Sequence, residues 1–138
     1  MNNMYEYEEN LYKEGYNFIA GTDEAGRGPL VGPVVAGCVV FPKGYKNDLI
    51  NDSKKLTEKK REQLYDIIIK DAVTYGIGIV SAKEIDELNI YEASRKAMIK
   101  AYEEANKKVK IDYLLTDAMP ITTLDIPVLK IIKGDAKS

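Results

Sequence analysis

Four acidic residues end or follow strand-like apolar stretches and are the side chains best suited to chemistry. Asp23 and Glu24 are adjacent at the end of the first stretch, Asp117 ends a later one, and Asp135 follows the last. Carboxylates brought together without cations repel, so such a cluster implies bound divalent ions, two of them about 4 Å apart. A pair of ions can clamp a scissile phosphate, one activating water and the other stabilising the leaving oxygen. The four acids therefore predict phosphodiester hydrolysis.

A glycine-rich turn follows Asp23 and Glu24. Side chains alternate faces along a strand, so both acids can reach one ion only if the strand stops at about Asp23. Gly26 and Gly28 have the conformational freedom for a sharp bend, and they let a ligand approach the backbone closely. Arg27, between them, is a forked donor suited to phosphate. The alternative interpretation is a hairpin turn with surface charges.

Alternating strand-like and helix-like patterns predict the elements that position these acids. Strands are expected over residues 16–23, 31–41, 73–79, 112–117 and 128–133. The residues Thr57, Ser81 and Asn89 are expected N-caps of the three helices between them.

Two of these helices have an apolar side that predicts how they pack. The helix after Thr57 is expected to lie on the sheet through Leu64, Ile67, Ile68 and Ala72. The helix after Asn89 has an inner side of Ile90, Ala93, Ala97, Ala101 and Ala105, and alanine permits close approach to the sheet. Gly76 and Gly78 in the third strand likewise suggest close packing or a bend.

The direction of the last two strands decides whether Asp117 and Asp135 can meet. In a hairpin they would lie at opposite ends, roughly 20 Å apart for about six residues. In parallel strands they would meet at one edge, and residues 118–127 would run back along the sheet, which their reach of up to about 33 Å permits. Taken alone, either aspartate is typical of a turn or a helix cap.

Composition narrows the chemistry. The 138 residues include no histidine, which excludes Ser-His-Asp and Cys-His catalysis and leaves carboxylates with Mg²⁺ or Mn²⁺. The net charge of -2 indicates neither a nucleic-acid binder nor an acidic tail. Cys38, the single cysteine, lies in an apolar run and is expected to be a buried reduced thiol. With no signal peptide or apolar run of about 18 residues, we expect one cytoplasmic domain.

Four segments resemble prokaryotic type 2 ribonuclease H, ribonuclease HII. They are residues 23–36 (DEAGRGPLVGPVVA), 52–56 (DSKKL), 113–117 (YLLTD) and 133–135 (KGD), in the family's order. The first segment is highly specific, and the second supports it. With the intervening helices, the resemblance covers residues 16–138.

The resemblance implies an α/β, ribonuclease H-like fold with a mixed five-stranded sheet of order 3-2-1-4-5 flanked by helices. It implies an endonuclease that cuts the RNA strand of RNA–DNA hybrids and ribonucleotides embedded in duplex DNA, leaving 5′-phosphate and 3′-hydroxyl ends. Its two ions, Mn²⁺ or Mg²⁺, would be held by residues corresponding to Asp23, Glu24, Asp117 and Asp135. The motif that reads the ribose 2′-hydroxyl corresponds to Gly26, Arg27 and Gly28, and phosphate would be held by Ser53 and Lys54.

Family members resemble this chain only over part of their length, because they continue past the KGD segment into further helices. The expectation is a C-terminally truncated chain, with residues 1–15 as an N-terminal extension and 16–138 as an incomplete catalytic domain. Apolar surface left uncovered would favour self-association. Two alternatives stay open: another nuclease of the same broad fold, such as a junction resolvase, and a non-catalytic remnant that binds metal or nucleic acid.

Overall fold

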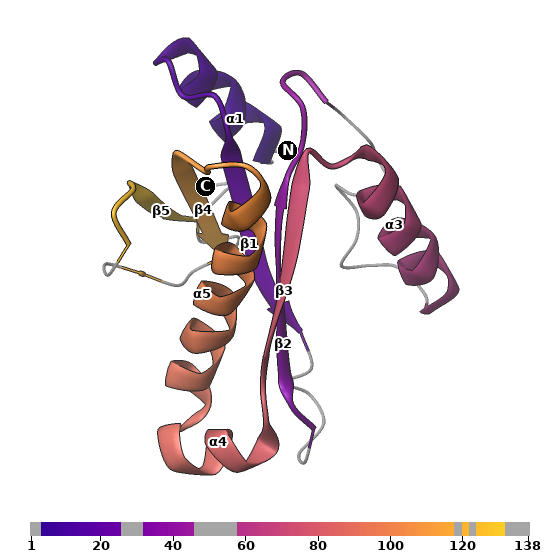
Figure 1. The fold of residues 1–138 in the computed structure, drawn as a ribbon, viewed down its shortest axis with the longest axis vertical. Coiled ribbons are helices and arrows are strands. Elements are labelled where there is room, and N and C mark those ends of the chain that lie inside the picture. The colour runs from indigo at the N-terminus through magenta and orange to yellow at the C-terminus, as the bar shows by residue number, and fades with distance from the viewer. Residues whose placement is uncertain (1–3, 26–31, 46–57, 118–119, 122–123, 132–138) are drawn as a thin grey trace.

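The computed structural model describes residues 4–25, 32–45, 58–117, 120–121 and 124–131. Within them, the strands form one mixed sheet in the order β3-β2-β1-β4-β5 (Figure 1). Their bounds are β1 Ile19–Ala25, β2 Val34–Val40, β3 Thr74–Val80, β4 Tyr113–Asp117 and β5 Val128–Ile131. β2 is antiparallel to β1 and β3, whereas β4 is parallel to β1 and β5. The implied strand order is confirmed, and the hairpin alternative for the last two strands is wrong.

Helices lie on both faces of this sheet (Figure 1). In the described part of the chain they are α1 Met4–Lys13, α3 Glu58–Asp71, α4 Ala82–Leu88 and α5 Ile90–Lys108. α5 covers one face and connects β3 to β4. α1 lies on the opposite face, where Leu11 packs with Ile19 and Leu115. Ala20, the next residue of β1, belongs to the core beneath α5, as alternation along a strand requires.

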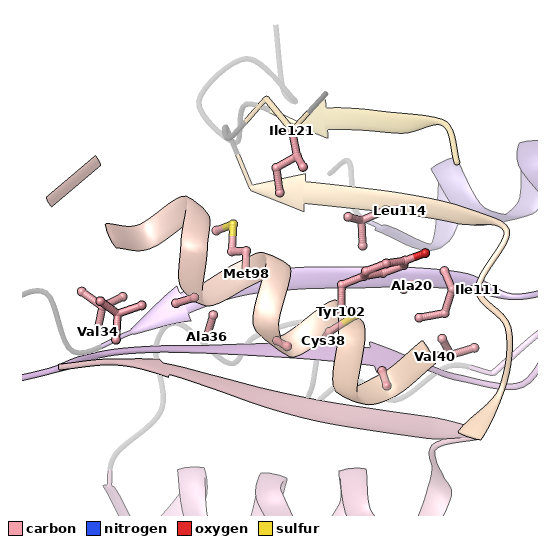
Figure 2. Packing of buried hydrophobic residues seen from close by; sticks show 14 of the residues in the cluster. Ala20, Val34, Ala36, Cys38, Val40, Met98, Tyr102, Ile111, Leu114 and Ile121 are labelled. Carbon is pink, nitrogen blue, oxygen red and sulfur yellow. The ribbon is translucent and has the colours of Figure 1, made fainter. Parts of the chain in front are cut away.

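The main core fills the space between α5 and the sheet (Figure 2). Met98 and Tyr102 of α5 meet buried side chains of the strands: Ala20, Val34, Ala36, Cys38, Val40, Val80 and Leu114. Cys38 is a free, buried thiol, as predicted, and burial raises its pKa to about 12. It is therefore protonated at neutral pH and serves as a small apolar core residue.

α5 approaches β3 very closely, because both surfaces are built from small residues. A Cβ added at Gly78 would lie 2.1 Å from the Ala97 carbonyl oxygen, and one added at Gly76 would lie 2.3 Å from that of Ala101. The close packing predicted from the alanines and glycines is confirmed. Ile90, predicted on the same inner side, is 42% exposed because it begins the helix at its junction with α4.

The helix predicted after Thr57 forms as α3; Thr57 itself lies outside the described residues. On its predicted packing side, Ile67, Ile68 and Ala72 are half-buried, and the Leu64 side chain is not described. Tyr65 and Ile69, outside that side, are 50% and 41% exposed. No described side chain of α3 joins either core cluster, so its packing on the sheet stays a prediction. The Tyr45 hydroxyl donates a hydrogen bond of 2.7 Å to the Asp71 carboxylate near the end of α3.

The predicted caps on either side of α4 are confirmed. The Glu84 amide donates to the Ser81 hydroxyl (3.2 Å), and the Glu92 amide donates to the Asn89 side-chain oxygen (3.0 Å). Asn89 ends α4 and begins α5 with a φ of 79°. Asparagine suits this junction because it tolerates positive φ better than most residues and still supplies the capping oxygen.

α1 is held to the sheet by aromatic side chains around Leu11. The rings of Tyr16 and Tyr113 meet edge to face at 4.7 Å between centroids, and the Lys43 ammonium lies 5.3 Å from the centroid of the Tyr12 ring. Glu8 is half-buried on α1, and burial raises its pKa from 4.5 to about 7. The docking of α1 therefore carries a charge-burial cost at neutral pH.

Replacing Glu8 with glutamine is expected to reduce the pH dependence of stability. The folded protein keeps the Glu8 proton up to about pH 7, whereas the unfolded chain releases it near 4.5, so stability falls between these values and stays low above them. At about pH 8 we expect Glu8→Gln to raise the free energy of unfolding by about 1–2 kcal/mol, because water still reaches part of the side chain. Thermal melts at about pH 5 and about pH 8 measure the difference.

Glu14→Gln, at an exposed position, is the matched control for this experiment. The control is expected to melt like the unmodified protein at both pH values. An equal gain for Glu8→Gln at both pH values would contradict a titrating carboxyl and indicate a packing effect instead.

Candidate active site

The parallel pairing of β1 with β4 brings two of the four predicted acids to neighbouring positions. Thr22 is registered with Thr116, and the next residue of each strand is Asp23 and Asp117. Paired positions on adjacent strands lie about 4.8 Å apart, so these two backbones meet at the same end of the sheet. The convergence predicted for these two acids is confirmed for the backbone; their side chains lie outside what the structure describes.

The register also places positions 23 and 117 on one face. Successive strand positions alternate between the two faces of the sheet. Positions 19, 21 and 23 of β1 are therefore on the face away from α5, and so are positions 113, 115 and 117 of β4. Ile19 and Leu115 belong to the cluster beneath α1, so Asp23 and Asp117 occupy register positions on that same face. The backbone pairing of β1 with β4 is therefore sufficient to bring positions 23 and 117 next to each other, whatever the conformation of the chain after β1.

The prediction that the first strand stops at about Asp23 is wrong. β1 continues to Ala25 and stays paired with β2, through Asp23 with Gly37, Glu24 with Ala36 and Ala25 with Val35. Pairing with β2 extends the strand past Asp23, and the glycines expected to make the bend lie outside the described residues. Consecutive strand positions fall on opposite faces, so the register does not group Glu24 with Asp23. The membership of Glu24 in the site rests on the sequence alone.

Asp135 follows β5, which is parallel to β4. Asp117 is registered with Ile131, four residues before Asp135. The carboxyl ends of β1, β4 and β5 therefore share one edge of the sheet, where parallel sheets place their sites. Asp135 itself lies outside the described residues, as do the predicted substrate-binding residues Gly26, Arg27, Gly28, Ser53 and Lys54.

Two buried threonines precede the acids Asp23 and Asp117, and the sequence interpretation missed them. Thr22 and Thr116 are 5% and 1% exposed, and the Thr22 hydroxyl donates a 2.7 Å hydrogen bond to the Gly37 carbonyl of β2. This bond ties β1 to β2 beside Asp23. The sequence carried a signal, because both strands contain the same Thr-Asp pair, a polar β-branched residue immediately before an acid.

Thr22→Val tests this tie, because valine keeps the shape and removes the hydroxyl. We expect a loss of about 1 kcal/mol in the free energy of unfolding, which lowers the melting temperature by about 3–4 °C. Thr22→Ser keeps the hydroxyl and serves as the control, with a smaller loss. A valine variant as stable as the unmodified protein would show that the hydrogen bond does not matter.

The donor set fits hard divalent cations. The four predicted acids supply only carboxylate oxygens, and the chain has no histidine to favour zinc. Asp23 and Asp117 sit at neighbouring backbone positions. Among the side chains that the structure describes, no group of three or more acidic or cysteine residues could hold a metal. The four predicted acids lie outside those side chains, so a metal site at this edge of the sheet stays a prediction.

Comparison with known proteins identifies the family of this chain. The family model described as Ribonuclease HII matches residues 20–137. A ribonuclease HII of Caldanaerobacter subterraneus subsp. tengcongensis is 61% identical over 132 residues, which are 96% of this chain and 54% of that protein. A ribonuclease HII of Bacillus subtilis is 53% identical over 136 residues, 99% of this chain and 52% of that one. The chain thus spans about half the length of these relatives.

Solved structures give the same fold. The ribonuclease H2 of Pyrococcus horikoshii OT3 matches with a TM-score of 0.69 and 29% identity, over 88% of this chain and 65% of that one. A Bst-RNase HIII solved in complex with Mn²⁺ has a TM-score of 0.57 at 13% identity, over 90% and 48% of the two chains, and supports the fold only. The family match over residues 20–137 establishes that the chain belongs to the ribonuclease HII family.

Proposed function

We propose that this chain carries the catalytic acids of a metal-dependent endonuclease that hydrolyses the RNA strand of RNA–DNA hybrids and ribonucleotides embedded in duplex DNA. The observation that carries the proposal is the register of β1 with β4, which brings Asp23 and Asp117 to neighbouring positions on one face. Family membership supports the substrate class. The products would be a 5′-phosphate and a 3′-hydroxyl end.

Within this proposal each predicted residue has a role. Asp23, Glu24, Asp117 and Asp135 hold two divalent ions, Mn²⁺ or Mg²⁺, which supply water activation and charge stabilisation at the scissile phosphate when bound. Gly26, Arg27 and Gly28 bring backbone amides to the ribose 2′-hydroxyl, the group that distinguishes RNA from DNA. Ser53 and Lys54 hold a neighbouring phosphate and fix its position beside the acids.

Three further features belong to the same proposal. Residues 1–15 form an extension, with α1 docked on the domain of residues 16–138. The site of action is the cytoplasm, which the reduced, buried Cys38 supports. No helix in the described part of the chain is long and apolar enough to cross a membrane.

The chain self-associates through uncovered apolar surface. The exposure of Ile77 and Ile79 on β3, 44% and 54%, supports this part of the proposal.

Cleavage of matched oligonucleotides tests the proposal. The 138-residue chain is offered a DNA duplex with one embedded ribonucleotide and the same duplex without it, across a titration of Mg²⁺ or Mn²⁺. We expect cutting of the first duplex only, dependent on the metal, with a 5′-phosphate on the product. Equal cutting of both duplexes would favour a junction resolvase-like nuclease. Binding without metal-dependent product would favour a non-catalytic remnant.

A further inference from the structure

Ser94 of α5 is fully buried, and its hydroxyl lacks a hydrogen-bond partner. Its exposed fraction is 0%, and no partner for its Oγ is found when the buried side chains of the described residues are considered. Two other buried hydroxyls of the same core, those of Thr22 and Thr74, each donate to a backbone carbonyl. Because an unpaired buried hydroxyl costs free energy, Ser94 requires a partner other than these described groups.

The packing of α5 on β3 fixes the level of Ser94 in the fold. The Ala97 carbonyl oxygen is the nearest atom to a Cβ added at Gly78. The Ala101 carbonyl oxygen is the nearest atom to one added at Gly76, so α5 runs antiparallel to β3. Ser94 precedes Ala97 by about 4.5 Å along the helix and therefore lies toward the C-terminal end of β3. It belongs to the buried side of α5, together with Ala97 and Ala101.

The strand register brings Glu24 to the same end of the core. Glu24 pairs with Ala36, and Ala36 pairs with Gly78, so these positions form one row across three strands. Ala36 belongs to the core beneath α5 (Figure 2), and directly opposed residues of antiparallel strands share a face. Position 24 is therefore on the face that α5 covers, and α5 contacts β1 as well as β2 and β3.

We propose that Ser94 is a positioning residue whose hydroxyl donates a hydrogen bond to the Glu24 carboxylate and holds it at the acid-bearing edge of the sheet. This pairing supplies the acceptor that the Ser94 hydroxyl lacks. It also explains how an acid on the α5 face is held beside Asp23, whose position is on the other face. Hydrogen bonds to a carboxylate are stronger than those between neutral groups, and groups that orient a metal-binding carboxylate strengthen metal binding.

The inference rests on the proposed function, in which Glu24 binds metal, and Ser94→Ala tests it. In the metal-free chain we expect the melting temperature to stay unchanged or rise, because alanine removes an unpaired polar group. Isothermal titration with Mn²⁺ is expected to show an affinity about tenfold lower than that of the unmodified chain. Ser94→Thr keeps a hydroxyl and is expected to bind Mn²⁺ more tightly than Ser94→Ala.

Thr74→Val is the matched control, because it removes a hydroxyl of the same core that has a partner. The Thr74 hydroxyl donates a 2.8 Å hydrogen bond to the Ala105 carbonyl, far from the acid-bearing edge. We expect a lower melting temperature and an unchanged Mn²⁺ affinity, the reverse of the result for Ser94→Ala.

A double-mutant cycle with Glu24→Ala identifies the partner of Ser94. If the hydroxyl acts through the Glu24 carboxylate, Ser94→Ala causes no further loss of Mn²⁺ affinity once that carboxylate is absent. An equal loss with and without Glu24, or a Ser94→Ala variant that binds Mn²⁺ like the unmodified chain, would overturn the inference and leave the cleavage proposal intact.

Two further results bear on it. A melting temperature that falls by many degrees in metal-free Ser94→Ala would show that the hydroxyl has a structural partner, and would overturn the inference as well. An unmodified chain that binds no Mn²⁺ would overturn the proposed function itself, and the role of Ser94 with it.

Discussion

Asp23→Asn is expected to lower both metal binding and cleavage by at least about 100-fold, because it removes one of two carboxylates at the paired ends of β1 and β4. Asp117→Asn should have a similar effect, since the register gives the two positions equivalent places. Isothermal titration with Mn²⁺ measures the binding, and cleavage of a duplex with one embedded ribonucleotide measures the activity.

The same substitutions separate a catalytic role from a structural one. Without metal, the removal of one negative charge relieves repulsion, so we expect the melting temperature to stay unchanged or rise slightly. Asp86→Asn, on an exposed residue of α4, is the control and should change neither affinity nor cleavage. A melting temperature that falls by many degrees in Asp23→Asn would indicate that the carboxylate supports the fold.

Gly78→Ala is expected to cause the largest loss of stability among single substitutions in β3. The added Cβ would lie 2.1 Å from the Ala97 carbonyl oxygen and 2.7 Å from the Ala101 amide nitrogen, both backbone atoms of α5. The helix must therefore move away from β3 along much of its length. We expect a loss of at least about 3 kcal/mol and a melting temperature lower by about 10 °C, measured by thermal or urea unfolding.

Gly37→Ala is the matched control, because it also lies in a strand and a Cβ there meets nothing within 4 Å. We expect its free energy of unfolding to stay within about 0.5 kcal/mol of the unmodified protein. If the two alanine variants were equally stable, the close approach of α5 to β3 would not hold in solution.

Much of this fold could be predicted from local patterns, because the deciding interactions are local. The caps at Ser81 and Asn89 depend on residues three positions apart, and the Ala97 to Ala105 side of α5 depends on helical spacing. The direction of β5 relative to β4 could not be predicted from the sequence. The residues that connect the two strands fit a hairpin and a return along the sheet equally well, so both the antiparallel and the parallel arrangement stayed open. The resemblance, rather than periodicity, supplied the strand order.

The error at the first strand has its cause in long-range packing. The end of β1 was misplaced because pairing with β2 continues the strand through Glu24 to Ala25, whatever the bend that follows. For the site, the sequence indicated Asp23 and Asp117, whereas the repeated threonine before each acid gained a structural meaning only when the register paired Thr22 with Thr116.

Anomalous diffraction from a crystal of this chain soaked in Mn²⁺ tests the central claim most directly. We predict manganese peaks at the carboxyl ends of β1 and β4, bound by Asp23 and Asp117, with the Asp135 carboxylate close enough to share an ion. Crystals that bind no manganese there, with Asp135 far from Asp23, would contradict the proposed catalytic centre.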